Sequence, residues 1–186
     1  MKTCLGIDPD VHKSAFAYLS VEGALLVQVV RQKDGKGREA ALALIQQAAF
    51  KEAVEFIQPD IIVVEGQDVR YTGKTSFANP QDVCNLALIT GAALALSYAP
   101  KKYSPLPREW KGNVPKGIKQ CRILDALGIK YEMKGGKDPY PVPVDFEQYC
   151  IGKVNASDWK DLNDAVGLAA WGLGKEKDIN DKVSGG

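Results

Sequence analysis

Four acidic residues occupy positions from which their carboxylates could bind metal ions together. Asp8 ends an apolar run near the start of the chain, and Glu65 ends the run Ile-Ile-Val-Val. Asp161 and Asp164 are three residues apart in a segment with helical periodicity, so they share a helix face and could reach the same ion. Four carboxylates placed together repel and raise one another's pKa values unless cations neutralise them. The set therefore predicts bound metal.

The donor set indicates which metal and which chemistry. Carboxylate oxygens select Mg²⁺ or Mn²⁺ over zinc, and the single histidine, His12, lies in a turn and is assigned no role. Two such ions about 4 Å apart can activate a water and stabilise the leaving oxygen in phosphodiester hydrolysis. The residues predict a metal-dependent nuclease that needs no histidine or serine nucleophile.

Each acid also has a common structural explanation, and these alternatives stay open. Asp8 precedes a proline and could open a turn. Asp161 and Asp164 could be solvated acids in the first half of a helix, where the helix dipole favours them. Glu65 is harder to explain in this way, because an ionisable group that closes a buried apolar run needs a partner.

The elements that must position these acids follow from periodicity and turn residues. The expected strands, of which the first three form an antiparallel meander, span residues 3–8, 15–19, 25–30, 60–65 and 102–106. The expected helices span residues 37–56, 79–98, 115–127 and 157–171, and Ser157 is the expected cap of the last. Residues 135–155 are rich in Pro and Gly and show little periodicity.

This order predicts an α/β fold with a five-stranded mixed sheet, three antiparallel strands plus parallel strands, flanked by helices. The strand at 60–65 is continuously β-branched, as expected of a parallel strand buried on both faces. We expect it to neighbour the first strand. Asp8 and Glu65 would then lie side by side at the carboxyl edge of the sheet, where ligands of such sheets bind.

Charge is distributed unevenly along the 186 residues. Residues 101–137 carry 10 basic and 3 acidic side chains, a net charge of +7, although the whole chain is only +1. A basic stretch beside a metal site is what phosphate binding requires, although a solvated lysine-rich surface is the alternative. Trp110, in this stretch, is interpreted as a core residue that could also contact nucleic acid.

Length and composition fit one domain, residues 1–174, followed by a polar tail over 175–186. The sequence has neither an 18-residue apolar run nor a signal peptide, so we expect no membrane partner and a cytoplasmic location in a bacterium or phage-infected host, with an organelle also possible. The four cysteines are widely spaced and predict reduced thiols.

The motifs resemble those of the RuvC family of Holliday junction resolvases. Four segments, which span nearly the whole chain in the family's order, carry the likeness: Gly6-Ile7-Asp8-Pro9, Val64-Glu65-Gly66-Gln67, the helix 79–96 with Thr90-Gly91-Ala92-Ala93, and Asp161-Leu162-Asn163-Asp164-Ala165. The resemblance implies a ribonuclease H-like fold. It also implies that the four acids coordinate two Mg²⁺ ions per subunit, with Mn²⁺ as a substitute, and that the substrate is branched DNA.

The same resemblance implies the DNA contacts and a homodimer. The segments Pro107 to Lys111 and Pro115 to Gln120 are similar to the family's basic region, so the candidate phosphate contacts are Arg108, Lys111, Lys116 and Lys119. A two-fold dimer would offer a four-way junction two matching sites for paired nicks. The small apolar face of helix 79–96 is a possible interface, although packing on the sheet would explain it as well.

Two segments depart from the family. An aromatic residue normally follows the Glu-Gln pair closely, whereas Gly66 intervenes here and the next loop is longer, which leaves Tyr71 and Phe77 as candidates to stack on DNA bases. Either could instead fasten the loop to the surface. Residues 130–155 also form a longer stretch than in bacterial resolvases, which affects substrate selectivity and dimer geometry.

Other functions remain as alternatives. A ribonuclease H or a ribosomal-RNA-processing nuclease would share the fold, although ribonuclease H takes its second acid from the first helix. An actin-like sugar kinase or ATPase also has an Asp on its first strand, but such proteins need two similar domains, and 186 residues supply only one. A branched-DNA-binding protein without activity is a further class, against which the presence of all four acids weighs.

Overall fold

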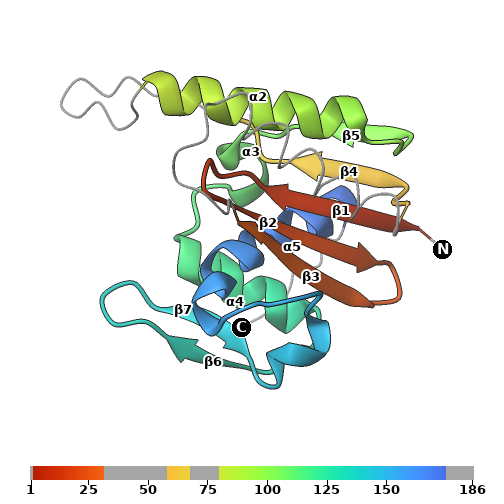
Figure 1. The fold of residues 1–186 in the computed structure, drawn as a ribbon. Coiled ribbons are helices and arrows are strands. Elements are labelled where there is room, and N and C mark those ends of the chain that lie inside the picture. The colour runs from red at the N-terminus through yellow and green to blue at the C-terminus, as the bar shows by residue number, and fades with distance from the viewer. Residues whose placement is uncertain (1, 32–57, 68–79, 175–186) are drawn as a thin grey trace.

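The computed structural model describes residues 2–31, 58–67 and 80–174 (Figure 1). Its first three strands, β1 (Thr3–Asp8), β2 (Lys13–Ser20) and β3 (Leu25–Arg31), pair antiparallel and confirm the predicted meander. Gly23, with a φ of 95°, closes the turn between β2 and β3, a conformation that glycine adopts without strain. The helix predicted over 37–56 and the tail over 175–186 lie outside the described residues.

The remaining strands extend the sheet in parallel. Strand β4 (Ile61–Val64) pairs parallel with β1, and β5 (Lys101–Tyr103) pairs parallel with β4. The strand order is β3-β2-β1-β4-β5, so the predicted five-stranded mixed sheet and the predicted neighbours, the first and fourth strands, are both confirmed. The last strand is three residues long: it begins one residue before the predicted 102–106 and ends three residues earlier than predicted.

Four helices of the described residues lie on or beside the sheet. They are α2 (Pro80–Leu96), α3 (Pro107–Lys111), α4 (Lys116–Ala126) and α5 (Trp159–Gly172). The predicted helix cap at Ser157 is wrong: Ser157 lies inside a short 3-10 turn, η2 (Ala156–Asp158), and Asp158 precedes the helix. No helix in the described part of the chain is long and apolar enough to cross a membrane.

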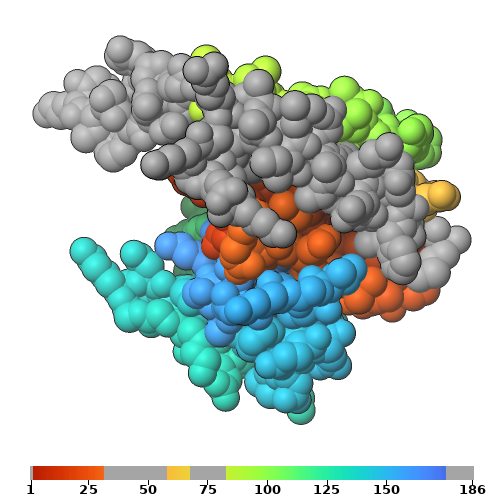
Figure 2. Space-filling model, viewed as in Figure 1, coloured from red at the N-terminus to blue at the C-terminus, as the bar shows by residue number. Residues whose placement is uncertain are grey.

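A second, small sheet begins just before the stretch without clear periodicity, residues 135–155, and continues into it. Strands β6 (Tyr131–Lys134) and β7 (Tyr140–Pro143) form an antiparallel hairpin, followed by the 3-10 turn η1 (Phe146–Tyr149). The hairpin, in cyan, stands out from the rest of the molecule in the space-filling view (Figure 2). These strands show no strand pattern in the sequence, because β6 is mostly exposed and β7 contains two prolines.

Apolar residues on both faces of the sheet form two core clusters. On one face Cys4, Val63 and their neighbours pack against α5, and on the other Leu5 and Ile62 pack with Ala93 of α2. The two helices therefore cover opposite faces, as Figure 1 shows. This explains why β1 and β4 contain continuous apolar runs, since strands covered on both sides have no solvent-facing positions.

Candidate active site

Asp8 and Glu65 lie side by side at the carboxyl edge of the sheet. Ile7 of β1 pairs with Val64 of β4, and the Glu65 amide donates a hydrogen bond to the Ile7 carbonyl at 3.0 Å. Asp8 alternates with Ile7 along β1 and so shares the sheet face that α5 covers. The sequence-based expectation for these two acids is therefore met by the strand pairing.

Helix α5 brings a third carboxylate to this edge because it lies directly on β1. Gly6 makes the close approach possible: a Cβ there would stand 2.1 Å from the Ala165 carbonyl oxygen and 2.5 Å from the Ala169 nitrogen. Asp164 precedes Ala165 and is 2% exposed. The contact between Gly6 and the backbone of α5 thus places Asp164 next to the end of β1.

Helix α3 supplies two side chains that bind Glu65. Pro107 occupies the first turn, where a missing N–H costs nothing, and the Glu109 carboxylate reaches back to the Leu106 amide at 2.6 Å. The indole Nε1 of Trp110 then donates to Glu65 Oε1 at 2.9 Å, and Lys111 Nζ binds the same oxygen at 2.9 Å.

Asp164 is held by three donors. Lys111 Nζ and Lys116 Nζ lie 3.0 and 2.9 Å from its Oδ2, and Gln120 Nε2 donates to Oδ1 at 2.9 Å. Gln120 also donates to the Lys160 carbonyl, so both partners of its nitrogen are acceptors and the orientation of the amide is determined. Lys111 is therefore a bridge between Glu65 and Asp164.

The ionisation of Asp8 is opposed by its burial and by the negative charge of its neighbours. Burial raises the pKa of Asp8 well above its usual range, and the neighbouring carboxylates Asp164 and Glu65 raise it further. Lys111 and Lys116 oppose this effect without cancelling it. Burial alone would lower the pKa of Lys111, but Asp164 and Glu65 outweigh burial and raise it.

The fourth predicted acid, Asp161, makes a different contact. Its Oδ2 lies 2.7 Å from Lys13 Nζ, at the start of β2. Lys13 also reaches Asp158 at 3.4 Å, and Arg31 binds the other oxygen of Asp158. Asp161 and Asp164 lie three residues apart on α5, as predicted. Their side chains nevertheless bind different lysines: Asp161 binds Lys13, and Asp164 binds Lys111 and Lys116.

The predicted DNA contacts lie in three different settings. Arg108 and Lys116 are exposed, as a phosphate contact requires. Lys111 instead lies within the carboxylate site, where it binds Glu65 and Asp164. Lys119 is only 4% exposed, so its expected contact with phosphate is not supported. The aromatic candidates Tyr71 and Phe77 lie outside the described residues.

The donor chemistry fits a hard cation, although the side chains are paired with lysines. In residues 2–31, 58–67 and 80–174, no three carboxylate, thiol or imidazole groups are arranged to hold an ion as they stand. Lys111 is the cation between Glu65 and Asp164. The carboxyl oxygens of Asp8, Glu65 and Asp164 are nevertheless the kind of ligand that Mg²⁺ and Mn²⁺ prefer.

Sequence reasoning missed Trp110 and Gln120 as partners of the carboxylates. Both are buried, at 1% exposed each, and both donate a neutral N–H to an acid. A useful signal was present for Trp110, because a tryptophan next to a lysine within a basic segment needs a partner for its indole N–H when it is buried. No such signal marked Gln120.

The strand order and the two covering helices define a ribonuclease H-like α/β fold, and solved structures narrow it further. RuvC of Thermus thermophilus in complex with a Holliday junction substrate is 17% identical, with a TM-score of 0.58 over 97% of this chain and 96% of that one. A second Thermus thermophilus RuvC structure matches equally well over 98% and 96%. The yeast mitochondrial Holliday junction resolvase Ydc2 is 16% identical, with a TM-score of 0.57 over 96% of this chain and 80% of that one. The chain therefore has a RuvC-like fold. No protein-family model and no curated protein matches it by sequence.

Proposed function

We propose that this protein is a metal-dependent endonuclease that cuts four-way DNA junctions by hydrolysing phosphodiester bonds. The observation that carries the proposal is the convergence of Asp8, Glu65 and Asp164 from β1, β4 and α5, beside the two ammonium groups of Lys111 and Lys116. Carboxylates that hold divalent ions next to cations that hold a phosphate are the components of phosphodiester hydrolysis.

The three carboxylates are the proposed ligands of Mg²⁺, with Mn²⁺ as a substitute. When bound, such an ion activates water and stabilises charge on the reacting phosphate. Lys111 now occupies the space between Glu65 and Asp164, so ion binding requires its ammonium to leave that position. Asp161 remains the predicted fourth ligand, for a second ion, and would first have to leave Lys13.

The lysines have a second role in this proposal. Lys111 and Lys116 extend from the segment with a net charge of +7, and once released from the acids their ammonium groups can bind the phosphate that is cut. Trp110 and Gln120 are positioning residues: each fixes one oxygen of a carboxylate and leaves the remaining oxygen for other partners.

Branched DNA is the proposed substrate and a homodimer the proposed form. The support for branched DNA is the Thermus thermophilus RuvC structure, which is in complex with a Holliday junction substrate. The support for a dimer is an exposed apolar stripe on α2, where Leu88 is 58% exposed and a Cβ on Gly91 would meet nothing within 4 Å. Small residues allow two such helices to approach closely.

The proposed dimer is tested by measuring the molar mass of the protein in solution. We expect Leu88→Asp to halve the molar mass measured by light scattering, because a charge would be buried in the interface. The control is Val21→Asp, a 43% exposed site in the β2–β3 turn. A wild-type monomer, or dimers of both variants, would contradict an interface on α2.

Cleavage is tested on matched four-way junction, flap, linear duplex and RNA/DNA hybrid substrates with Mg²⁺. We expect paired nicks in the junction, and a loss of rate by orders of magnitude in Asp8→Asn, Glu65→Gln and Asp164→Asn. Glu147→Gln, which changes an exposed acid in η1, is the control. Asp161→Asn should have a smaller effect, since Asp161 is bound to Lys13.

Competition separates the proposal from a general nuclease. Excess unlabelled linear duplex should compete poorly with the junction, because a dimer engages two phosphates at once and the second contact forms at high effective concentration. If linear duplex or RNA/DNA hybrid displaces the junction as effectively as unlabelled junction does, the resolvase proposal fails.

A further inference from the structure

A hollow of about 680 Å³ lies beside the carboxylate site, between α4 and the β6–β7 hairpin. We call it the α4 pocket. Its apolar wall consists of Pro115, Ile118, Met133, Pro139 and Tyr140. The volume falls within the range of roughly 300–1,000 Å³ that is usual for pockets that bind small ligands.

Two side chains in the wall connect the pocket to the carboxylate site. Lys116 and Gln120 both line the pocket, and both bind Asp164 at 2.9 Å, on different oxygens. Gln120 also binds the main chain of Lys160, a third lining residue. An occupant of the pocket would therefore be separated from Asp164 by one side chain.

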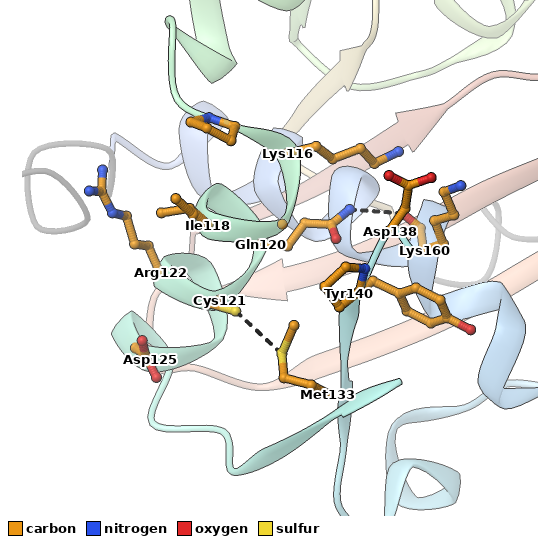
Figure 3. A pocket seen from close by; sticks show the side chains of 13 residues that line it. Lys116, Ile118, Gln120, Cys121, Arg122, Asp125, Met133, Asp138, Tyr140 and Lys160 are labelled. Atoms are coloured by element: carbon orange, nitrogen blue, oxygen red, sulfur yellow. Dashed lines mark hydrogen bonds between the residues drawn. The ribbon is translucent and has the colours of Figure 1, made fainter. Parts of the chain in front are cut away.

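Charge is arranged at the ends of the pocket, and apolar groups lie between them. Figure 3 shows Lys116 and Lys160 extending together with Asp138 at one end, and Arg122 with Asp125 at the other. The middle is apolar, and there the sulfur atoms of Cys121 and Met133 lie 3.7 Å apart, while Tyr140 lines the pocket on the side of Lys160. The arrangement suits a flat, mostly apolar group joined to an anion.

We propose that the α4 pocket receives one unstacked nucleobase of the DNA strand whose phosphate lies at the carboxylate site. This inference rests on the proposed function. Successive nucleotides of one strand are spaced about 3.4 Å apart along a duplex, so a nucleotide next to the cut reaches the wall that Lys116 and Gln120 form.

The chemistry of the wall favours a base over other occupants. Unpaired bases bind proteins by stacking on aromatic rings, and Tyr140 offers one ring while Met133 offers a polarizable sulfur. The half-exposed side chains Ile118 and Met133 would lose contact with water when the base entered. The ammonium of Lys116 at the rim matches the phosphate on the same nucleotide.

A base enters such a pocket most easily where the duplex is already interrupted. Extrusion from an intact duplex costs a few kcal/mol, and the cost is least for a base that is not fully paired or stacked. The α4 pocket therefore gives the enzyme a preference for cutting near a branch point, and a preference for the base that fits best. Cleavage-site selection is the property that this pocket controls.

The test combines removal of a base from the DNA with substitutions in the wall of the pocket. Single-turnover cleavage is measured on junctions with an abasic site at each of the two positions on either side of the cut. The enzymes are the wild type, Ile118→Ala and Met133→Ala, whose side chains are 50% and 48% exposed and so contribute little to folding. The control, Val144→Ala, changes a 44% exposed residue outside the pocket.

At one position we expect the abasic site to slow the wild type and Val144→Ala by about tenfold, the size of one lost stacking contact. The same abasic site should slow Ile118→Ala and Met133→Ala by less than about threefold, because their pocket already lacks part of that contact. Equal slowing in all four proteins, or no slowing at any position, overturns the pocket. A wild type that cuts no junction contradicts the proposed function itself, and the two failures are thereby distinguished.

Discussion

Removal of the Lys111 ammonium tests whether the protein carries its own counter-ion between Glu65 and Asp164. In Lys111→Met two charge-assisted hydrogen bonds, of 2.9 and 3.0 Å, are lost. Hydrogen bonds to charged groups contribute about 1.5–3 kcal/mol each. The carboxylates keep other donors, from Trp110 and Lys116, so we expect a net loss of about 2–3 kcal/mol in metal-free buffer, below the sum of the two bonds.

For a domain of this size about 1 kcal/mol changes Tm by about 2–4 °C, so the expected decrease in Tm is about 4–12 °C. The pKa of Lys111 is raised, so its contribution is fully present below the unfolded value of about 10.4 and is lost as the pH rises through the folded value. The decrease should therefore stay constant between about pH 7 and pH 9 and diminish at higher pH.

The assay is thermal unfolding in EDTA and in excess Mg²⁺. An ion that binds only the folded protein stabilises it by RT ln(1 + [ion]/Kd), and in Lys111→Met one ammonium fewer competes for the site, since Lys116 alone of the two lysines still binds Asp164. We expect Mg²⁺ to raise the Tm of the variant more than that of the wild type. Lys102→Met is the control, since Lys102 is exposed and its ammonium donates to the main-chain carbonyl of Leu94.

Two results would refute this reasoning. The first is a free energy of unfolding for Lys111→Met in EDTA equal to that of Lys102→Met, which would mean that the bridge contributes nothing. The second is equal stabilisation of the wild type and Lys111→Met by Mg²⁺, which would mean that the ion does not bind where the ammonium lies.

Three further predictions follow from the site and its support. Asp8→Asn should raise the free energy of unfolding in metal-free buffer. The gain should grow as the pH rises from about 4, because the pKa of Asp8 is raised in the folded protein and its ionisation opposes folding. A gain that is independent of pH in urea titrations would contradict this. Lys116→Ala should weaken binding to junctions of every sequence, and should lower by about one the slope of log binding constant against log salt concentration. If fluorescence anisotropy at several salt concentrations gives an unchanged slope, the DNA lies elsewhere. Gly6→Ala should prevent folding, because its Cβ would lie 2.1 Å from a backbone oxygen. Gly136→Ala, where an added Cβ would meet nothing within 4 Å, should raise the free energy of unfolding by about 0.4–1 kcal/mol; circular dichroism melts that rank the two alike would contradict the packing.

The sheet and two of its acids could be predicted from sequence because each depends on a local pattern. The apolar runs before Asp8 and Glu65 mark strands that are covered on both faces, and the short connections of the meander leave few possible orders. The place of Asp164 also follows from helical spacing. These predictions needed no knowledge of distant side chains.

The partners of the carboxylates could not be predicted in the same way. Helical spacing places Asp161 and Asp164 on one face, but Lys13, far away in the chain, binds Asp161 and separates the roles of the two acids. Gln120 is a polar residue at a helical position with no distinguishing pattern, and only the packing of α4 on α5 brings it to Asp164.

The contact of Gly6 with α5 has a consequence for how this site tolerates change. The spacing between the ends of β1 and α5 is set by main-chain atoms, the Gly6 Cα and the Ala165 carbonyl, and not by the size of any side chain. Exchanges of apolar residues elsewhere on α5 can alter the core without shifting Asp164 along the strand. A protein built in this way can change widely in its side chains and still keep its acids in register.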